Sequence, residues 1–216
     1  MAKSWDAIII GGGAAGLFCA GVAGQLGKKV LVLDHAEVLC EKIRISGGGR
    51  CNFTNLHSSP ANFLSLNPNF VKSALARYPS KEFIKLVQSY RIAYHEKHQG
   101  QLFCDDSAKQ IIEMLLGECA KGRVDIRHPV QVESISNEDG VWVVNTNAGT
   151  ERSKSIVMAT GGLPVPAIGA TAYSLDIAKQ FDLKVVDPRP ALVPLSFTSG
   201  EFDNLRSEEH TSELQS

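Results

Sequence analysis

The chain opens with an unbroken apolar run that ends in glycines. Residues 7–10, Ala-Ile-Ile-Ile, include no polar position, as expected for a strand buried on both faces of a parallel sheet. Residues 14–26, rich in Ala, Gly and Leu, predict a helix that ends at Gly27, and a second apolar run follows at 30–33. This order of apolar strand, helix and apolar strand predicts a βαβ unit with parallel strands.

The turn between the first strand and the helix has the glycine spacing of a nucleotide-binding loop. Gly11, Gly13 and Gly16 fill G-x-G-x-x-G. The first allows a tight bend, the second lets backbone approach a pyrophosphate, and the third lets the helix pack closely on the strand. The free N–H groups of the helix that begins near Ala14 favour an anion, so Ala14 and Ala15 join the glycines as candidate contacts. The alternative is a glycine-rich turn without a ligand.

Asp34 follows the second apolar run. It lies about 20 residues beyond the glycine turn, where a carboxylate accepts both ribose hydroxyls of a nucleotide. An acid here argues against a 2′-phosphate on that nucleotide. The alternative is a capping or solvated aspartate.

Patterns farther along the chain predict more elements. Residues 130–136 and 141–146 alternate apolar with polar residues across Asn-Glu-Asp-Gly, which predicts an antiparallel hairpin. We expect helices at 70–78, 81–90 (with Ser80 as N-cap), 106–121 and 172–181, strands at 100–104, 124–127, 155–162 and 183–186, and solvated His95 and His98 in a loop between brief strands.

Composition limits the classes of function. A chain with 44% hydrophobic and 21% charged residues is ordinary globular material, and its net charge of -1 predicts no attraction to nucleic acid or membrane. A signal-peptide core and an apolar run of membrane-spanning length are both missing, which predicts a cytoplasmic protein. The five cysteines show neither C-x-x-C pairs nor a ligand cluster, so we expect reduced thiols and no metal site.

A second glycine cluster lies in residues 45–55, Ile-Ser-Gly-Gly-Gly-Arg-Cys-Asn-Phe-Thr-Asn. Its backbone can lie against a flat or anionic ligand, with Arg50 as a fixed cation and with amide and hydroxyl groups beside it. A mobile surface loop is the alternative.

Gly11–Gly16 together with Lys42-x-x-x-Ser46-Gly-Gly-Gly-Arg-Cys-Asn-x-Thr-Asn55 resembles a bacterial flavoprotein family. This family includes BaiN-type bile-acid reductases and aminoacetone-oxidase-like proteins, and the second motif is the more specific. The resemblance covers residues 6 to about 204 and implies a Rossmann-type FAD-binding domain of the glutathione-reductase kind. In that family these residues are the N-terminal part of a protein roughly twice as long. The resemblance further implies cofactor contacts at Lys42, Ser46, Gly47, Gly48, Arg50, Cys51 and Asn52.

The hairpin bears on the choice of cofactor, because FAD domains of this kind insert a β-meander where a plain NAD domain continues with βα units. We therefore expect an α/β fold with a parallel sheet plus a β-meander. By resemblance, the backbone at Val130 meets the adenine, and Ala159, Thr160 and Gly161, at the carboxyl end of a buried strand, approach the cofactor. A simple strand end is the alternative. Relatives commonly carry Phe-Pro where this chain has Phe103-Cys104, which leaves that turn in doubt.

We expect three segments in the chain. Residues 1–190 form the N-terminal part of the FAD-binding domain, and residues 191–205 begin a crossover into an inserted substrate domain that is missing here. Residues 206–216 read like a translated sequencing adapter and are set apart as a non-native tail. The fold is accordingly expected to be truncated, and this piece of the enzyme is expected to be poorly stable and inactive, because the missing strands leave apolar surface of the sheet exposed.

These features predict an FAD-dependent oxidoreductase that passes hydride from NAD(P)H through FAD to a small organic substrate or oxygen. Arg50 is expected to stabilise negative charge on phosphate or reduced flavin. Cys51 is the cysteine whose place invites a redox role, although disulfide exchange lacks the usual second thiol. No catalytic residue is assigned, and the oligomeric state stays open. The alternatives are a plain NAD-dependent dehydrogenase, a flavin- or nucleotide-binding module without catalysis, and a flavoprotein serving RNA modification, which the absence of a basic stripe disfavours.

Overall fold

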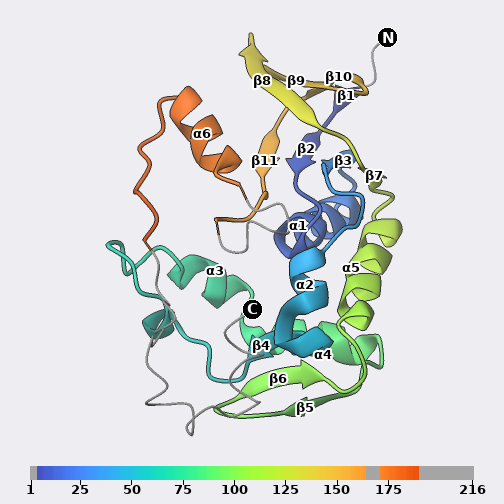
Figure 1. Cartoon of the computed structure of the whole chain (residues 1–216), viewed down its shortest axis with the longest axis vertical. Helices are drawn as coiled ribbons and strands as arrows, with labels where there is room; N and C mark the ends of the chain where they lie inside the picture. The colour runs from blue at the N-terminus through green and yellow to red at the C-terminus, as the bar shows by residue number, and fades with distance from the viewer. Residues whose placement is uncertain (1–3, 164–170, 190–216) are drawn as a thin grey trace, which may run out of the picture.

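The computed structural model describes residues 4–163 and 171–189 of the 216-residue chain. The predicted crossover and tail, and most of the loop after Gly162, lie outside these residues. Three sheets are stacked along the long axis, with the parallel sheet in the middle (Figure 1). The helices are α1 (Ala14–Gln25), α2 (Glu41–Ile45), α3 (Lys72–Arg77), α4 (Ser80–Ser89), α5 (Lys109–Lys121) and α6 (Tyr173–Gln180), with short 3₁₀ turns η1 (Ser46–Gly49) and η2 (Pro60–Asn62).

The central sheet has the strand order β11-β2-β3-β7, and all its neighbouring strands are parallel. Its strands are β2 (Ala7–Ile10), β3 (Val30–Leu33), β7 (Asp125–Arg127) and β11 (Ile156–Met158). β2 therefore lies beside β11, which follows almost 150 residues later in the sequence. This arrangement confirms the predicted βαβ unit and parallel sheet.

Each face of the parallel sheet has its own core. Ile9, Val30 and Val32 pack with α1 and α5, whereas Ile8 and Leu31 pack with the meander and α6. All five side chains are fully or almost fully buried. Burial on both faces is the reason why these strands contain no polar position.

A β-meander packs on the second face of the sheet. It consists of β8 (Val132–Glu138), β9 (Val141–Thr146) and β10 (Gly149–Ser153), and β1 (Ser4–Trp5) pairs in parallel with β10. The indole of Trp5 and the guanidinium of Arg127 both donate hydrogen bonds to Glu151, which ties this sheet to the parallel one. The predicted meander is thus confirmed, and β10 extends the hairpin by a strand.

The third sheet, β4-β6-β5, is antiparallel and lies at the opposite end of the molecule from the meander (Figure 1). Its strands are β4 (Asn52–Asn55), β5 (Tyr94–Glu96) and β6 (Gln101–Cys104). The second glycine cluster therefore leads into this sheet.

Some local predictions were wrong. Residues 183–186 form no strand, and Leu183 and Val186 are exposed. Two apolar side chains are not enough to form a strand where no neighbouring strand pairs with them. Pro79 is the N-cap of α4, and Ser80 is already helical. His95 lies in β5, where its imidazole contacts the Asp105 carboxylate at 2.7 Å, and is not in a loop.

No helix in the described part of the chain is long and apolar enough to cross a membrane. The predicted domain boundaries stay predictions.

Candidate functional site

The three glycines of the turn after β2 have different roles: two allow close packing of the backbone, and one leaves room for a ligand. At Gly11 (φ +110°) a Cβ would overlap the backbone at Ala159, and at Gly16 it would overlap the carbonyl oxygen of Gly11. A Cβ at Gly13, the N-cap of α1, would meet open space. The first and third glycines thus allow close packing, and the second leaves the helix N-terminus open to a ligand.

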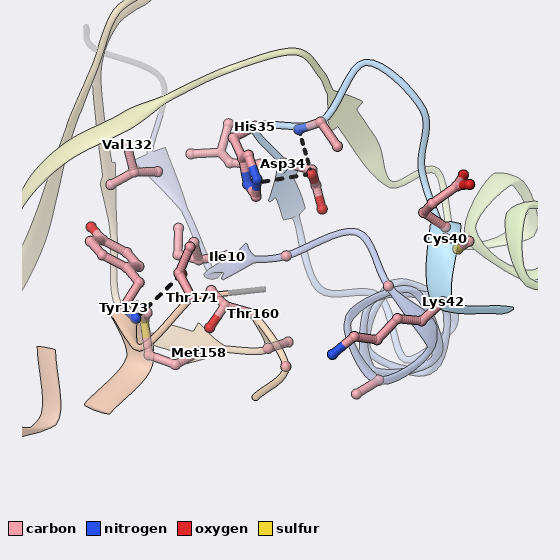
Figure 2. A pocket seen from close by; sticks show the side chains of 18 of the residues that line it. Ile10, Asp34, His35, Cys40, Lys42, Val132, Met158, Thr160, Thr171 and Tyr173 are labelled. Atoms are coloured by element: carbon pink, nitrogen blue, oxygen red, sulfur yellow. Dashed lines mark hydrogen bonds and ion pairs between the residues drawn. The ribbon is translucent and has the colours of Figure 1, made fainter. Parts of the chain in front are cut away.

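A cavity of about 830 Å³ lies at this helix terminus. It is bounded by the carboxyl ends of β2, β3 and β11, with α2, the start of β8 and the start of α6 around them (Figure 2). Open α/β sheets bind ligands at the carboxyl ends of their strands. Its volume falls within the usual range of ligand pockets.

The structure brings ten of the predicted cofactor-binding residues together around this cavity: Gly11, Gly13, Ala14, Ala15, Asp34, Lys42, Val130, Ala159, Thr160 and Gly161. These residues come from five separate stretches of sequence. The other seven do not line the cavity: Gly16, Ser46, Gly47, Gly48, Arg50, Cys51 and Asn52.

Asp34 is held in place by backbone amides. Its Oδ2 accepts a hydrogen bond from the Gly12 N–H, and its Oδ1 accepts one from Ala36 N at 2.8 Å. The Nδ1 of His35 lies 3.8 Å from Oδ1 (Figure 2). Each carboxylate oxygen keeps a further lone pair, so the side chain is fixed and still able to accept ribose hydroxyls.

Lys42 provides a cation on the opposite side of the helix mouth. It projects from α2, its Nζ lies 3.4 Å from the carbonyl oxygen of Gly162, and its side chain is exposed. An ammonium group here complements the helix N-terminus in attracting phosphate oxygens. Asp34 and Lys42 thus flank the open end of α1 (Figure 2).

Two buried hydroxyl groups in the cavity wall have no hydrogen-bond partner among the described residues: Thr160 Oγ1 and Tyr173 Oη. Burial raises the pKa of Tyr173, so its hydroxyl stays protonated and can donate. Buried polar groups without partners are uncommon in folded proteins and need an explanation. A polar ligand in this cavity would provide the missing partners, and the site therefore fits a dinucleotide with ribose and phosphate oxygens.

Sequence reasoning missed Tyr173, Cys40 and His35 as cavity residues. Tyr173 begins α6, whose place in the cavity wall depends on the packing of Ile177 against the meander. Cys40 adopts φ +62°, and its thiol donates to the carbonyl oxygen of Gly12 at 3.2 Å. Burial and the nearby charge of Asp34 raise the pKa of Cys40 to about 11. None of these residues carries a signal that sequence spacing could reveal.

The second glycine cluster follows α2 directly and is held against β6 and α5. Gly47, Gly48 and Gly49 all have positive φ, and a Cβ at Gly47 would lie 2.6 Å from the Phe103 ring. The N–H of Ala108 donates to Gly49 O at 2.7 Å. Close packing thus explains the glycine at position 47, whereas Gly48 faces open space.

Arg50 and Cys51 differ in accessibility. Arg50 is exposed, whereas the Cys51 thiol is buried and its pKa is raised by that burial. A thiol of this kind is a poor nucleophile at neutral pH. The proposed contacts of this cluster with a cofactor stay predictions.

Among residues 4–163 and 171–189, no three His, Cys, Asp or Glu side chains gather as a metal site would require. The chemistry that the described cavity offers is binding of an anionic, polyhydroxylated ligand.

Comparison with protein families gives a match over residues 5–211 to the model described as HI0933-like protein Rossmann domain. Among curated proteins, "Ribosomal RNA dihydrouridine synthase" of Escherichia coli (strain K12) is 50% identical over 204 residues, which are 94% of this chain and 51% of that protein. The "3-dehydro-bile acid delta(4,6)-reductase" of Clostridium scindens (strain ATCC 35704 / DSM 5676 / VPI 13733 / 19) is 25% identical over 197 residues, 90% of this chain and 48% of that protein. The chain thus spans about half the length of these relatives.

Comparison with solved structures shows the fold. Glycine oxidase from Bacillus cereus ATCC 14579 superposes with a TM-score of 0.53 at 18% identity, over 74% of this chain and 56% of that one. Together with the family match, this likeness confirms the predicted α/β fold, a Rossmann-type FAD-binding fold with a parallel sheet.

Proposed function

Because the chain belongs to the family of HI0933-like proteins with a Rossmann domain, we propose that it is the FAD-binding part of a flavin-dependent oxidoreductase. The observation that carries this proposal is the cavity at the N-terminus of α1, where Asp34 and the Gly13 turn meet the start of the β-meander. A plain NAD domain has no meander at this place, which disfavours the dehydrogenase alternative.

The residues of the cavity have separate tasks in this proposal. Asp34 accepts the ribose hydroxyls, the free N–H groups of α1 and the Lys42 ammonium hold the pyrophosphate, and the backbone at Val130 contacts the adenine. The hydroxyls of Thr160 and Tyr173 gain hydrogen-bond partners. Bound FAD would supply hydride transfer, for which we propose NAD(P)H as donor.

For the electron acceptor, the two relatives suggest different substrates. One is named for dihydrouridine formation in ribosomal RNA at 50% identity, and the other for reduction of a 3-dehydro-bile acid at 25% identity. Higher identity favours an RNA pyrimidine over the small organic substrate or oxygen expected from the sequence. In such a reaction, the ring C=C bond gains a hydride at one carbon and a proton at the other.

The expected cytoplasmic location stays a prediction.

Titration with FAD tests the proposal. Because the described residues already form the cavity, the purified chain should retain about one equivalent of FAD after gel filtration, in contrast to the poor stability expected from the sequence, and an excess of NAD⁺ should not displace it. Replacing Asp34 by Ala should weaken FAD binding by about tenfold, equivalent to ~1.4 kcal/mol, while Asp6→Ala, on a half-buried carboxylate at the opposite end of β2 that does not line the cavity, should leave binding unchanged. Loss of FAD from the wild-type chain, or its displacement by NAD⁺, would disprove the proposal.

Addition of NADPH or NADH to the FAD-loaded chain without oxygen then separates a reductase from a binding module. Bleaching of the yellow colour supports a reductase, whereas colour that persists favours a binding role for this part of the protein.

A further inference from the structure

Positive charge is concentrated in one continuous part of the sequence. Residues 42–98 hold nine of the 22 lysines and arginines but only two of the 23 aspartates and glutamates. This part therefore has a net charge of +7, and the rest of the chain has -8. The near-neutral total of -1 is the sum of two oppositely charged parts of the sequence.

The basic part of the sequence is also one region in space. It forms α2, η1, β4, η2, α3, α4 and β5, most of which lie at the end of the molecule opposite the meander (Figure 1). Aromatic rings join these elements to one another and to α1. The ring of Phe18 in α1 lies 4.9 Å from Tyr78 and 6.4 Å from Phe83, and Phe53 in β4 lies 5.5 Å from Tyr94. We call residues 42–98 the basic region.

Several cationic side chains of the basic region are exposed and available to bind an anionic ligand. Arg44 is paired with Glu41, and Lys85 with Glu82. Five further cations are exposed and form no ion pair within the described part of the chain: Arg50, Lys72, Arg77, Lys81 and Arg91. Five unpaired cations in one region, with only two acidic residues among them, give this region a positive potential that attracts anions.

Exposed aromatic side chains lie among these cations. Phe70, two residues before Lys72, is 77% exposed, and Phe63 and Tyr78 are also partly accessible. Arginine and lysine contact phosphate groups, and aromatic rings provide stacking surfaces for unpaired bases. A single-stranded polynucleotide would use both kinds of group at once, the cations for its phosphates and the aromatic faces for its bases.

The basic region extends to the candidate site. Lys42 lines the cavity, and Arg77 precedes Tyr78, whose ring packs on Phe18 in the second turn of α1. The first residues of that helix, Ala14 and Ala15, also line the cavity. A polyanion on this region would thus lie next to the place where the cofactor is proposed to bind.

We infer that the basic region is an RNA-binding surface that holds the phosphate backbone of single-stranded RNA beside the flavin site. This inference rests on the proposed function and assigns the surface and the residues that hold the proposed RNA substrate. It departs from the expectation of no nucleic-acid partner, which depended on the near-neutral net charge and on the absence of a short basic stripe and did not count charge over longer segments.

Binding of a short, unstructured, fluorescein-labelled RNA to the FAD-loaded chain tests the inference by fluorescence anisotropy. Five phosphate contacts predict a slope of log K against log salt of about -3.5 between ~50 and ~200 mM salt. The variant Lys72→Ala/Lys81→Ala/Arg91→Ala should bind RNA at least about tenfold more weakly and reduce the magnitude of that slope by about 2.

A matched variant removes the same charge elsewhere. Lys28, Lys179 and Lys184 are exposed, lie outside the basic region and form no ion pair within the described residues, so their joint replacement by Ala should leave RNA affinity within about twofold. Equal weakening by both variants, no effect of the first, or binding to phosphatidylserine vesicles without binding to RNA would overturn the inference. FAD binding is measured for both variants as well. If both retain FAD while the RNA result contradicts the inference, only the RNA surface is disproved and the proposed flavin site stands.

Discussion

Substitutions at two glycines of the turn after β2 are expected to have different effects, one on the stability of the fold and the other on FAD binding. A methyl group at position 16 would overlap Gly11, whereas one at position 13 would point into the cavity mouth. Gly16→Ala should therefore lower the free energy of unfolding by about 1–3 kcal/mol. Gly13→Ala should change it by less than about 0.5 kcal/mol and weaken FAD binding instead. Urea unfolding and FAD titration of both variants provide the measurements, and similar stability losses would contradict this account.

At this scale the sequence predicted the residues whose role depends on spacing. Gly11, Gly13 and Asp34 follow from the geometry of a strand, a turn and a helix, which are local features. Tyr173 could not be predicted, because it reaches the cavity only after α6 packs on the meander through Ile177. The glycines at 47 and 48 were predicted as ligand contacts, yet the structure gives Gly47 a packing reason through Phe103.

At the scale of elements, the contact between α1 and α5 depends on small residues and one carboxylate. A Cβ at Gly24 would lie 2.5 Å from the carbonyl oxygen of Gly122, so the helices approach closely. Glu118 on α5 accepts hydrogen bonds from Gln25, Tyr90 and Lys121 at 2.6–2.9 Å. Burial acts to raise the pKa of Glu118, but these hydrogen bonds outweigh it and lower the pKa from 4.5 to about 2.

Replacing Glu118 by Gln should lower the free energy of unfolding by about 1–2 kcal/mol near neutral pH. Because the folded pKa lies below the unfolded one, this stabilisation is complete above about pH 5 and is lost as the pH falls from 4.5 towards 2. Urea unfolding at several pH values measures the difference between variant and wild type. Glu113→Gln, on an exposed residue of the same helix, is the control, and a difference that persisted at pH 2 would contradict the assignment.

The elements with continuous patterns were predicted best. β2 and β3 agree with their predicted bounds, and α1 ends one residue before its predicted end. These elements could be predicted because an uninterrupted apolar run marks each strand and Gly27 marks the end of the helix. The pairing in the β4-β6-β5 sheet was not predicted, since it joins residues about 50 positions apart through a bulge between Asn52 and Thr54. β11 is shorter than predicted because its last positions turn towards the cavity.

For the whole molecule, cysteine reactivity is expected to report cooperative unfolding. Burial raises the pKa values of Cys40, Cys104 and Cys119 to about 11, and these residues lie in the core shared by α1, α5 and the glycine cluster. At pH 8 the three thiols should label only at the urea concentrations that unfold the chain, as measured by mass spectrometry of modified peptides. Labelling of Cys104 well before Cys119 would instead show that the β4-β6-β5 sheet opens separately.

The distribution of charge over the molecule was the property that overall composition predicted least well. A total of -1 predicted no polyanionic partner, because a sum contains no information about position. The excess of basic residues in 42–98 can be counted from the sequence, but only the folded chain gathers most of this region at one end of the molecule and brings part of it beside the candidate site.

The position of β11 has a consequence for synthesis. This strand completes the sheet beside β2, and the cavity walls also require Val130 and Tyr173. A nascent chain that has left the ribosomal exit tunnel only as far as β7 therefore carries the glycine turn and Asp34 but half of a binding site. Capture of the flavin must await translation of α6, so the supply of cofactor cannot act on the first βαβ unit alone.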